Sequence, residues 1–113
     1  MNRVNRYFRL AKLVAEHGGV RRQYRLGAVG IRTDGAIVMA SNLSSRKPEY
    51  RAHAEARLTR KLNIGSEVFI VRILRNGSFA NARPCRRCQT LLKRRGVRRC
   101  YYSISDDEYG VIQ

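Results

Sequence analysis

The order of helix-like and strand-like segments constrains the fold of this chain most. Apolar residues recur at helical spacing over residues 5–17, on a stripe that contains Tyr7 and Leu10. Two strand-like runs, YRLGAVGIR and AIVMAS, flank the sequence TDG, which is typical of a tight hairpin turn at Asp34-Gly35. A polar loop follows, then an alanine-rich helical segment at 51–65 and the apolar run EVFIVRIL. The first part of the chain therefore predicts helix, hairpin, helix and buried strand.

The second part continues this alternation. Pro84 opens a third helical segment that runs to about Arg95, and VRRCYYSI at 97–104 is a further strand, followed by a turn and one short strand. The order α-β-β-α-β-α-β(-β) favours an α/β fold, a three-layer α/β/α sandwich built on one sheet. Too few residues follow CYYS for another long helix, so an antiparallel final hairpin is expected. The 113 residues predict a single domain over 1–113.

Arginine dominates the charge of the chain. Lys and Arg number 24 against 8 Asp and Glu, which gives a net charge of +16. A solvated, soluble surface is the simple explanation, but charge of this density in a small chain favours a polyanionic partner. No apolar run approaches the ~20 residues of a membrane span, and the first segment is too interrupted by charge for a signal peptide. A cytoplasmic protein without membrane attachment is predicted.

Two cysteines, Cys85 and Cys88, stand in the arginine-rich segment RPCRRCQTLLKRRG. An odd total of three cysteines argues against a disulfide framework and leaves a metal site, a redox dithiol or a nucleic-acid patch. The start of the third helix turns both thiols to one side, where exposed amides lower their pKa. His53 opens the second helix, so these three side chains make a ligand set with one position free, as in catalytic zinc sites. Cys100 is read as a core residue and His17 as a capping or surface residue.

The segments HAE at 53–55 and PCRRC at 84–88 resemble the zinc-dependent cytidine/deoxycytidylate deaminase superfamily, over about residues 25–102. The resemblance implies Zn²⁺ held by His53, Cys85 and Cys88. It implies that Glu55 takes a proton from water and delivers it to the ring nitrogen and the departing amine. The reaction would be hydrolytic attack on the amine-bearing carbon of a base, with release of ammonia.

The resemblance also implies residues that hold the substrate. The backbone amide of Ala54 and the carbonyl of Arg83 would bind the edge of the base. Asn42, eleven residues before His53, corresponds to a sugar- or base-contacting asparagine of the tRNA adenosine deaminases; its simpler explanation is a residue that ends a strand. Those enzymes carry an Asp-Pro-Thr-Ala run before the histidine, whereas this chain has PEYRAHAE, so cytosine is favoured over adenine.

Substrate size remains open between two classes. Cations beside both motifs favour cytosine in single-stranded nucleic acid, while a free nucleotide or nucleoside such as dCMP or cytidine is the alternative. An adenosine deaminase that acts on RNA and a non-catalytic, zinc-stapled nucleic-acid-binding module are less favoured. Because related deaminases often form oligomers, a homo-oligomer is a further expectation. Tyr50, Tyr101 and Tyr102 are candidates to stack bases, although one of the two consecutive tyrosines is expected to face the core. The residues expected to bind nucleic acid are Arg86, Arg87, Arg94 and Arg95.

Overall fold

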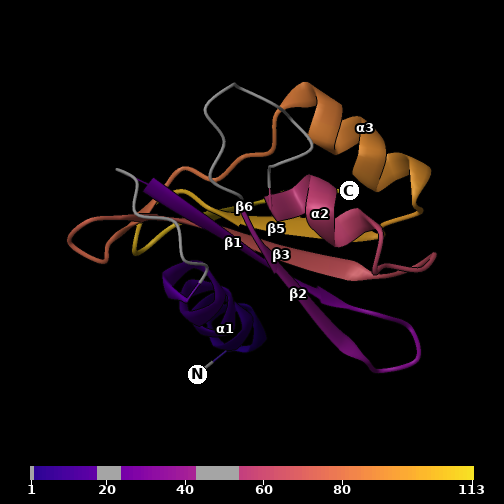
Figure 1. Cartoon of the computed structure of the whole chain (residues 1–113), viewed down its shortest axis with the longest axis horizontal. Coiled ribbons are helices and arrows are strands. Elements are labelled where there is room, and N and C mark those ends of the chain that lie inside the picture. The colour runs from indigo at the N-terminus through magenta and orange to yellow at the C-terminus, as the bar shows by residue number, and fades with distance from the viewer. Residues whose placement is uncertain (1, 18–23, 43–53) are drawn as a thin grey trace.

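Figure 1 shows the computed structural model of the chain, which describes residues 2–17, 24–42 and 54–113. The elements follow the predicted order, with one additional two-residue strand after β3. In chain order they are α1 (Arg3–Glu16), β1 (Tyr24–Ile31), β2 (Ile37–Ser41), α2 (Ala54–Thr59), β3 (Glu67–Leu74), β4 (Phe79–Ala80), α3 (Arg86–Arg94), β5 (Arg99–Ser103) and β6 (Tyr109–Ile112).

One sheet organises the described residues, with strand order β2-β1-β3-β5-β6 and β4 paired to β3. Its strands pair antiparallel except β3 and β5, which run parallel and are joined through α3. Helix α1 lies on one face, and α2 and α3 lie on the other (Figure 1). This arrangement confirms the three-layer α/β/α sandwich, and the antiparallel β5–β6 hairpin confirms the predicted end of the sheet.

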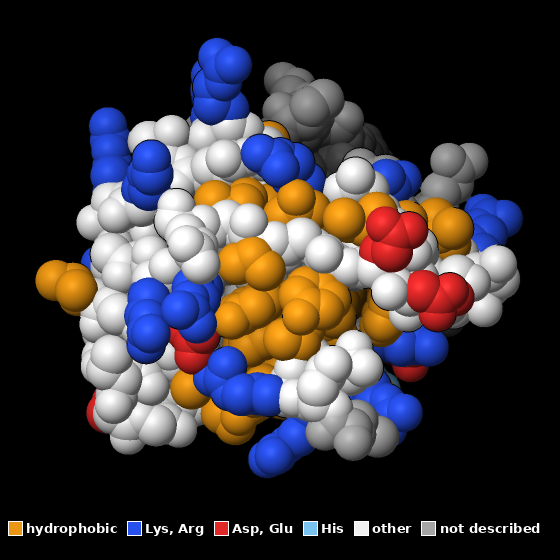
Figure 2. Space-filling model, turned by 180° about the vertical axis from the view of Figure 1, so that it is seen from behind, with side chains coloured by type: hydrophobic (Ala, Val, Ile, Leu, Met, Phe, Trp, Pro, Cys, Tyr) orange, Lys and Arg blue, Asp and Glu red, His pale blue; other side chains and the backbone are white. Residues whose placement is uncertain are grey.

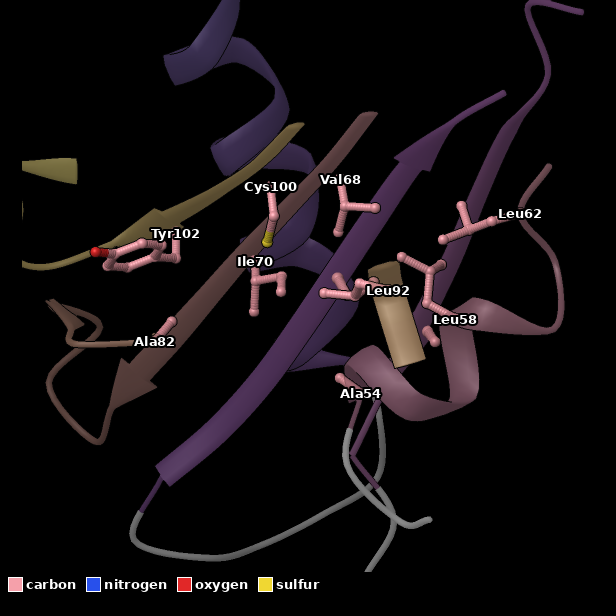
Figure 3. Close-up of a cluster of buried hydrophobic side chains, with 11 residues drawn as sticks. Ala54, Leu58, Leu62, Val68, Ile70, Ala82, Leu92, Cys100 and Tyr102 are labelled. Carbon is pink, nitrogen blue, oxygen red and sulfur yellow. The ribbon is translucent and has the colours of Figure 1, made fainter. Parts of the chain in front are cut away.

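Each face of the sheet has its own hydrophobic core. Under α1, Phe69 stacks on Tyr101 with ring centroids 4.8 Å apart, and Phe8 of the helix packs edge-on to Phe69. On the other face, side chains of α2, α3 and the strands β1, β2, β3 and β5 form a common cluster, part of which is labelled in Figure 3. Cys100 belongs to this second cluster and is 2% exposed, as predicted for a core residue. No helix in the described part of the chain is long and apolar enough to span a bilayer.

The buried stripe of α1 differs in phase from the prediction. Of the four stripe residues predicted from the sequence, only Ala11 is fully buried, and the other three lie at the margin of the core. Small residues set this phase, because they let the helix approach the sheet closely where β1 carries Gly27. The predicted stripe was Tyr7, Leu10, Ala11 and Val14, and the buried residues are Val4, Phe8, Ala11 and Ala15.

Gly27 marks the closest approach of α1 to the sheet. A Cβ added there would lie 2.1 Å from the Ala11 carbonyl oxygen and 3.0 Å from the Ala15 Cβ. We expect Gly27→Ala to lower the free energy of unfolding by about 1–3 kcal/mol, because the helix backbone must move away. Chemical denaturation measures this loss, with Ala36→Val at an exposed position as the control that adds bulk in open space. Equal stability of Gly27→Ala and wild type would contradict the close packing.

Helix α2 is shorter than predicted. The sequence predicted a helix to Gly65, but the regular turns end at Thr59, and the amides of Lys61 and Leu62 bond to carbonyls three residues back. This tighter turn buries Leu62 in the second core. Gly65 has a φ of +90° and donates its amide to the Gly96 carbonyl at 2.8 Å, which ties the chain after α2 to the chain after α3.

Candidate active site

The N-terminal ends of α2 and α3 meet on the same face of the sheet. Glu55, in the first turn of α2, is 3% exposed. Cys88, in the first turn of α3, is fully buried, while Cys85 is the exposed N-cap residue of that helix. The Cys88 sulfur is hydrogen-bonded to the Cys85 side chain and accepts a hydrogen bond from the backbone amide of Ala56. The structure thus brings Glu55 together with two predicted site residues that follow it by 30 and 33 positions in the sequence.

The electrostatics of this cluster differ from the sequence prediction. Burial raises the pKa of the Cys88 thiol far above its usual range, and the negative charge of Glu55 and the neighbouring Cys85 raise it further. The Ala56 amide acts in the opposite direction, but the helix N-terminus does not outweigh burial. For Cys88, the prediction that the start of the third helix lowers the pKa of the thiol is therefore wrong. The charge of a divalent cation would offset that of two sulfurs beside a buried carboxylate and displace the thiol protons. The described residues alone form no group of three such side chains that could hold a metal ion, and the predicted ligand His53 is not among them.

His53 lies outside the described residues, next in sequence to the first residue of α2. Ala54 is fully buried at the start of that helix. The other histidine, His17, is the C-cap of α1, where its Nδ1 lies 2.8 Å from the Leu13 carbonyl oxygen. It is exposed at the helix end and caps the helix, as predicted.

The segment that leads into Cys85 is fixed to β5. The amide of Ala82 donates to the Ser103 carbonyl at 2.8 Å, and an Arg83 Nη1 donates to the Tyr102 hydroxyl at 3.0 Å. The Arg83 guanidinium also lies 5.7 Å from the centre of the Tyr102 ring. Sequence reasoning missed this role of Tyr102, although strand alternation puts it on the same face as Cys100. Both consecutive tyrosines are buried, Tyr101 under α1 and Tyr102 on the opposite face, and Tyr50 lies outside the described residues.

Asn42 has a structural role at the end of β2. Its side-chain oxygen accepts the amide of Leu26 at 2.9 Å, and its own amide donates to the Leu26 carbonyl at 3.2 Å. The residue is 7% exposed. Because Oδ1 is bonded to β1, the side-chain amide nitrogen is the group with which Asn42 could meet a substrate acceptor.

The structure separates the four arginines predicted to bind nucleic acid. Three of them line an open hollow of about 500 Å³ together with Thr90 and Leu91. Arg95 instead donates from Nε to the Leu62 carbonyl at 2.9 Å and from Nη2 to the Arg60 carbonyl at 3.4 Å. It therefore joins the end of α3 to the chain after α2. The residues that line the hollow are Arg86, Arg87 and Arg94.

A model of the family described as "Cytidine and deoxycytidylate deaminase zinc-binding region" matches residues 1–104. The chain belongs to this deaminase family. The resemblance predicted from HAE and PCRRC is thereby confirmed, and membership supports a hydrolytic deaminase. The family is named for its zinc-binding region, which points to Zn²⁺ as the cofactor of its members.

Two solved cytidine deaminase structures have a fold similar to that of this chain. The structure from Burkholderia pseudomallei is 14% identical with a TM-score of 0.71, and the alignment covers 100% of this chain and 93% of that one. The structure from Mycobacterium leprae is 17% identical with a TM-score of 0.56, over 91% of this chain and 87% of that one. A search of curated proteins finds no match. At these identities the likeness establishes the cytidine deaminase-like fold and leaves the substrate to be argued from the site.

Proposed function

We propose that this chain is a zinc-dependent hydrolytic deaminase that converts cytosine to uracil with release of ammonia, acting on cytosine in single-stranded nucleic acid. The observation that carries the proposal is the meeting of Glu55 with Cys85 and Cys88 at two helix N-termini, in a member of the deaminase family. All 113 residues would form one domain that works in the cytoplasm.

His53, Cys85 and Cys88 would hold the Zn²⁺ ion. A bound zinc ion supplies Lewis acidity, which makes hydroxide available from water near neutral pH. Cys88 is held by burial and by the Ala56 amide, so its sulfur has a fixed position at the start of α3. His53 immediately precedes Ala54, the first residue of α2, in the sequence.

Glu55 would move the protons. Its carboxylate is buried beside Cys88, where water competes little for its hydrogen bonds. It would accept a proton as water attacks the amine-bearing carbon, protonate the ring nitrogen, and then protonate the departing amine. One water is consumed, and the carbon–nitrogen bond to the amine breaks as ammonia leaves.

Backbone groups would hold the base. The Ala54 amide and the Arg83 carbonyl would face the edge of the ring, and the bond from Arg83 to Tyr102 supports the segment that carries this carbonyl. Asn42 would use its side-chain amide nitrogen, since its oxygen is bonded to Leu26. This leaves Asn42 as a donor, suited to an oxygen of the sugar or base.

Cytosine within a strand is favoured over a free nucleotide by the cationic hollow on α3. A mononucleotide presents one phosphate group, whereas a strand presents one phosphate per nucleotide and can use a row of cations. Arg86 and Arg87 lie between the proposed ligands in sequence, and Arg94 lies two turns further along the same helix. A free-nucleotide or nucleoside deaminase is the alternative, since the catalytic groups would be the same.

Product formation from parallel substrates tests the proposal. Ammonia and uracil are measured with dCMP, cytidine and a single-stranded oligonucleotide containing one cytosine, with the same oligonucleotide carrying thymine as the control. We expect ammonia from the cytosine oligonucleotide and none from the thymine control. Turnover of dCMP or cytidine alone would favour the alternative, and absence of any turnover by a zinc-loaded protein would leave a binding module.

Neutralising the α3 hollow should weaken strand binding. We expect a variant with Arg86, Arg87 and Arg94 changed to Gln to bind a thymine oligonucleotide more weakly and with a flatter salt dependence. The slope of log affinity against log salt should become shallower by about 0.7 for each phosphate that the variant no longer binds. Because a thymine strand is not a substrate, fluorescence anisotropy measures binding of the strand to this surface without any contribution from turnover.

Arg95→Gln is the matched control for that triple variant. It removes one charge at the C-cap of α3 and also two hydrogen bonds to backbone carbonyls. It should therefore lower the melting temperature, whereas its effect on oligonucleotide affinity should be smaller than that of the triple variant. If the triple variant kept the wild-type salt slope, the hollow would not be a phosphate-binding surface.

A further inference from the structure

The two edges of the sheet are protected differently. At the β2 edge, Arg57 of α2 donates to the Ser41 carbonyl and Lys61 donates to the Met39 carbonyl, both at 2.6 Å. These cations cap the outer backbone of β2. The opposite edge is β6, whose four residues Tyr-Gly-Val-Ile carry no charge. A short apolar strand at the end of a sheet has backbone donors and acceptors on its outer side, which can pair with another strand.

The face of the sheet beside β6 is apolar and incompletely covered. Tyr109 and Val111 are 43% and 42% exposed. They continue an aromatic row in which Phe69 stacks on Tyr101 and Tyr101 lies 6.1 Å from Tyr109. Helix α1 packs mainly against β1 and β3, and its Phe8 ring reaches the edge of Tyr109, with ring centroids 5.9 Å apart. Figure 2 shows the molecule from behind, with hydrophobic side chains gathered at the centre of this view.

Opposite charges stand at the two ends of the β5–β6 hairpin. Its turn holds Asp106, Asp107 and Glu108, three of the chain's 8 acidic residues, and all three are exposed. The open end of the hairpin carries Arg98 and Arg99. In Figure 2, acidic side chains lie to the right of the hydrophobic area, although acidic side chains are also visible on its left and Lys and Arg side chains lie on all sides of it. A two-fold axis through β6 would exchange the ends, so each acidic turn would meet a basic end.

We infer that β6 pairs antiparallel with β6 of a second copy of this chain and joins the two sheets. Side chains alternate along a strand, so the register decides which faces match. With Gly110 opposite the partner's Gly110, Tyr109 lies opposite the partner's Val111. The exposed Tyr109 and Val111 side chains of both copies then lie on the same face of the joined sheet. Cys100 pairs with Ile112 within each hairpin, which puts Arg99 opposite Gln113. The same register brings Asp107 opposite the partner's Gln113, next to the partner's Arg99.

This interface is independent of the proposed activity. It lies at the β6 edge, whereas Glu55 and the cysteines lie at the N-terminal ends of α2 and α3. The occupant is a second copy because the hairpin is complementary to itself, with acid at one end and base at the other. The net charge of +16 opposes association at long range, but at 0.15 M salt the screening length is about 8 Å and contacts at the interface dominate.

Sedimentation velocity at about 0.15 M salt tests the pairing. The expected result is a species of twice the 13.0 kDa chain mass at micromolar concentrations. Val111→Lys, a change at an exposed position, should shift the chain to monomer while circular dichroism shows the native fold. A wild-type chain that remains monomeric, or a dimer that persists in Val111→Lys, would overturn the proposal.

A charge exchange tests the register. Asp107→Arg and Arg99→Asp should each weaken the dimer by roughly tenfold or more, since each puts like charges together, and the double variant should recover most of the loss. Asp34→Arg, an acidic residue in the distant β1–β2 turn, is the control and should leave the dimer unchanged. Failure of the double variant to recover would exclude this register and with it the proposed pairing.

Discussion

Glu55→Gln should keep the fold and one zinc per chain while losing about 10²–10⁴-fold of deaminase activity. The amide has the shape of the carboxylate but cannot accept and deliver the protons that the reaction needs. Zinc should be retained because the two sulfurs and His53 are unchanged. The substitution also removes a negative charge that raises the pKa of the Cys88 thiol, so ligation by sulfur is not weakened.

Turnover and metal content are measured on the same Glu55→Gln sample. Glu16→Gln is the matched control, since Glu16 is near Lys12 at 3.9 Å on α1 and far from the site in the fold. That variant should be as active as wild type. If Glu55→Gln were equally active, Glu55 would not carry the protons and the proposed mechanism would fail.

Loss of a ligand should have the second large effect. We expect one zinc per chain in the wild type, and its loss in His53→Ala, Cys85→Ala and Cys88→Ala. A metal that binds only the folded state stabilises it by about 4 kcal/mol at a thousand times its dissociation constant. For a chain of this size, that corresponds to a fall in melting temperature of roughly 15 °C when the metal is removed.

Metal analysis and thermal unfolding with and without a chelator make this measurement. Cys100→Ala provides the control. Cys100 is a buried cysteine whose pKa is also raised by burial and by the charge of Glu55, but it lies on β5 in the second core and is not a proposed ligand. It should keep its zinc and still respond to chelator. Full zinc occupancy in Cys88→Ala would show that the metal is held elsewhere.

Strong local signals in the sequence were enough to predict most of the fold. EVFIVRIL matches β3 at both ends, and Asp34-Gly35 forms the turn between β1 and β2, with Gly35 at a φ of +88°. The end of α2 could not be predicted, because the helical pattern continues past Thr59 while burial of Leu62 favours a tighter turn. Helix α3 starts at Arg86 rather than at Pro84, with Cys85 as its cap.

The sequence predicted which residues of the candidate site lie near one another where residue type and helix position agree. Glu55, Cys85 and Cys88 come from HAE and PCRRC, and the fold brings these three together, while their roles stay predictions. The sequence could not separate Arg95 from the other arginines, because its contacts are with carbonyls more than thirty residues away. It could not reveal the high pKa of the Cys88 thiol either, since burial of that side chain depends on the packing of α3.

Parallel pairing of β3 with β5 makes part of the fold depend on contacts between distant segments of the chain. The β1–β2 hairpin and its contacts with α1 join near neighbours in sequence, whereas β5 reaches β3 only after the whole of α3 has crossed the sheet. Such non-local pairing forms slowly, because a long loop must close before any contact rewards it. Glu55 and the two cysteines likewise meet only when distant segments of the chain have come together. Refolding followed with a zinc indicator would therefore report the formation of long-range contacts rather than of the local hairpin.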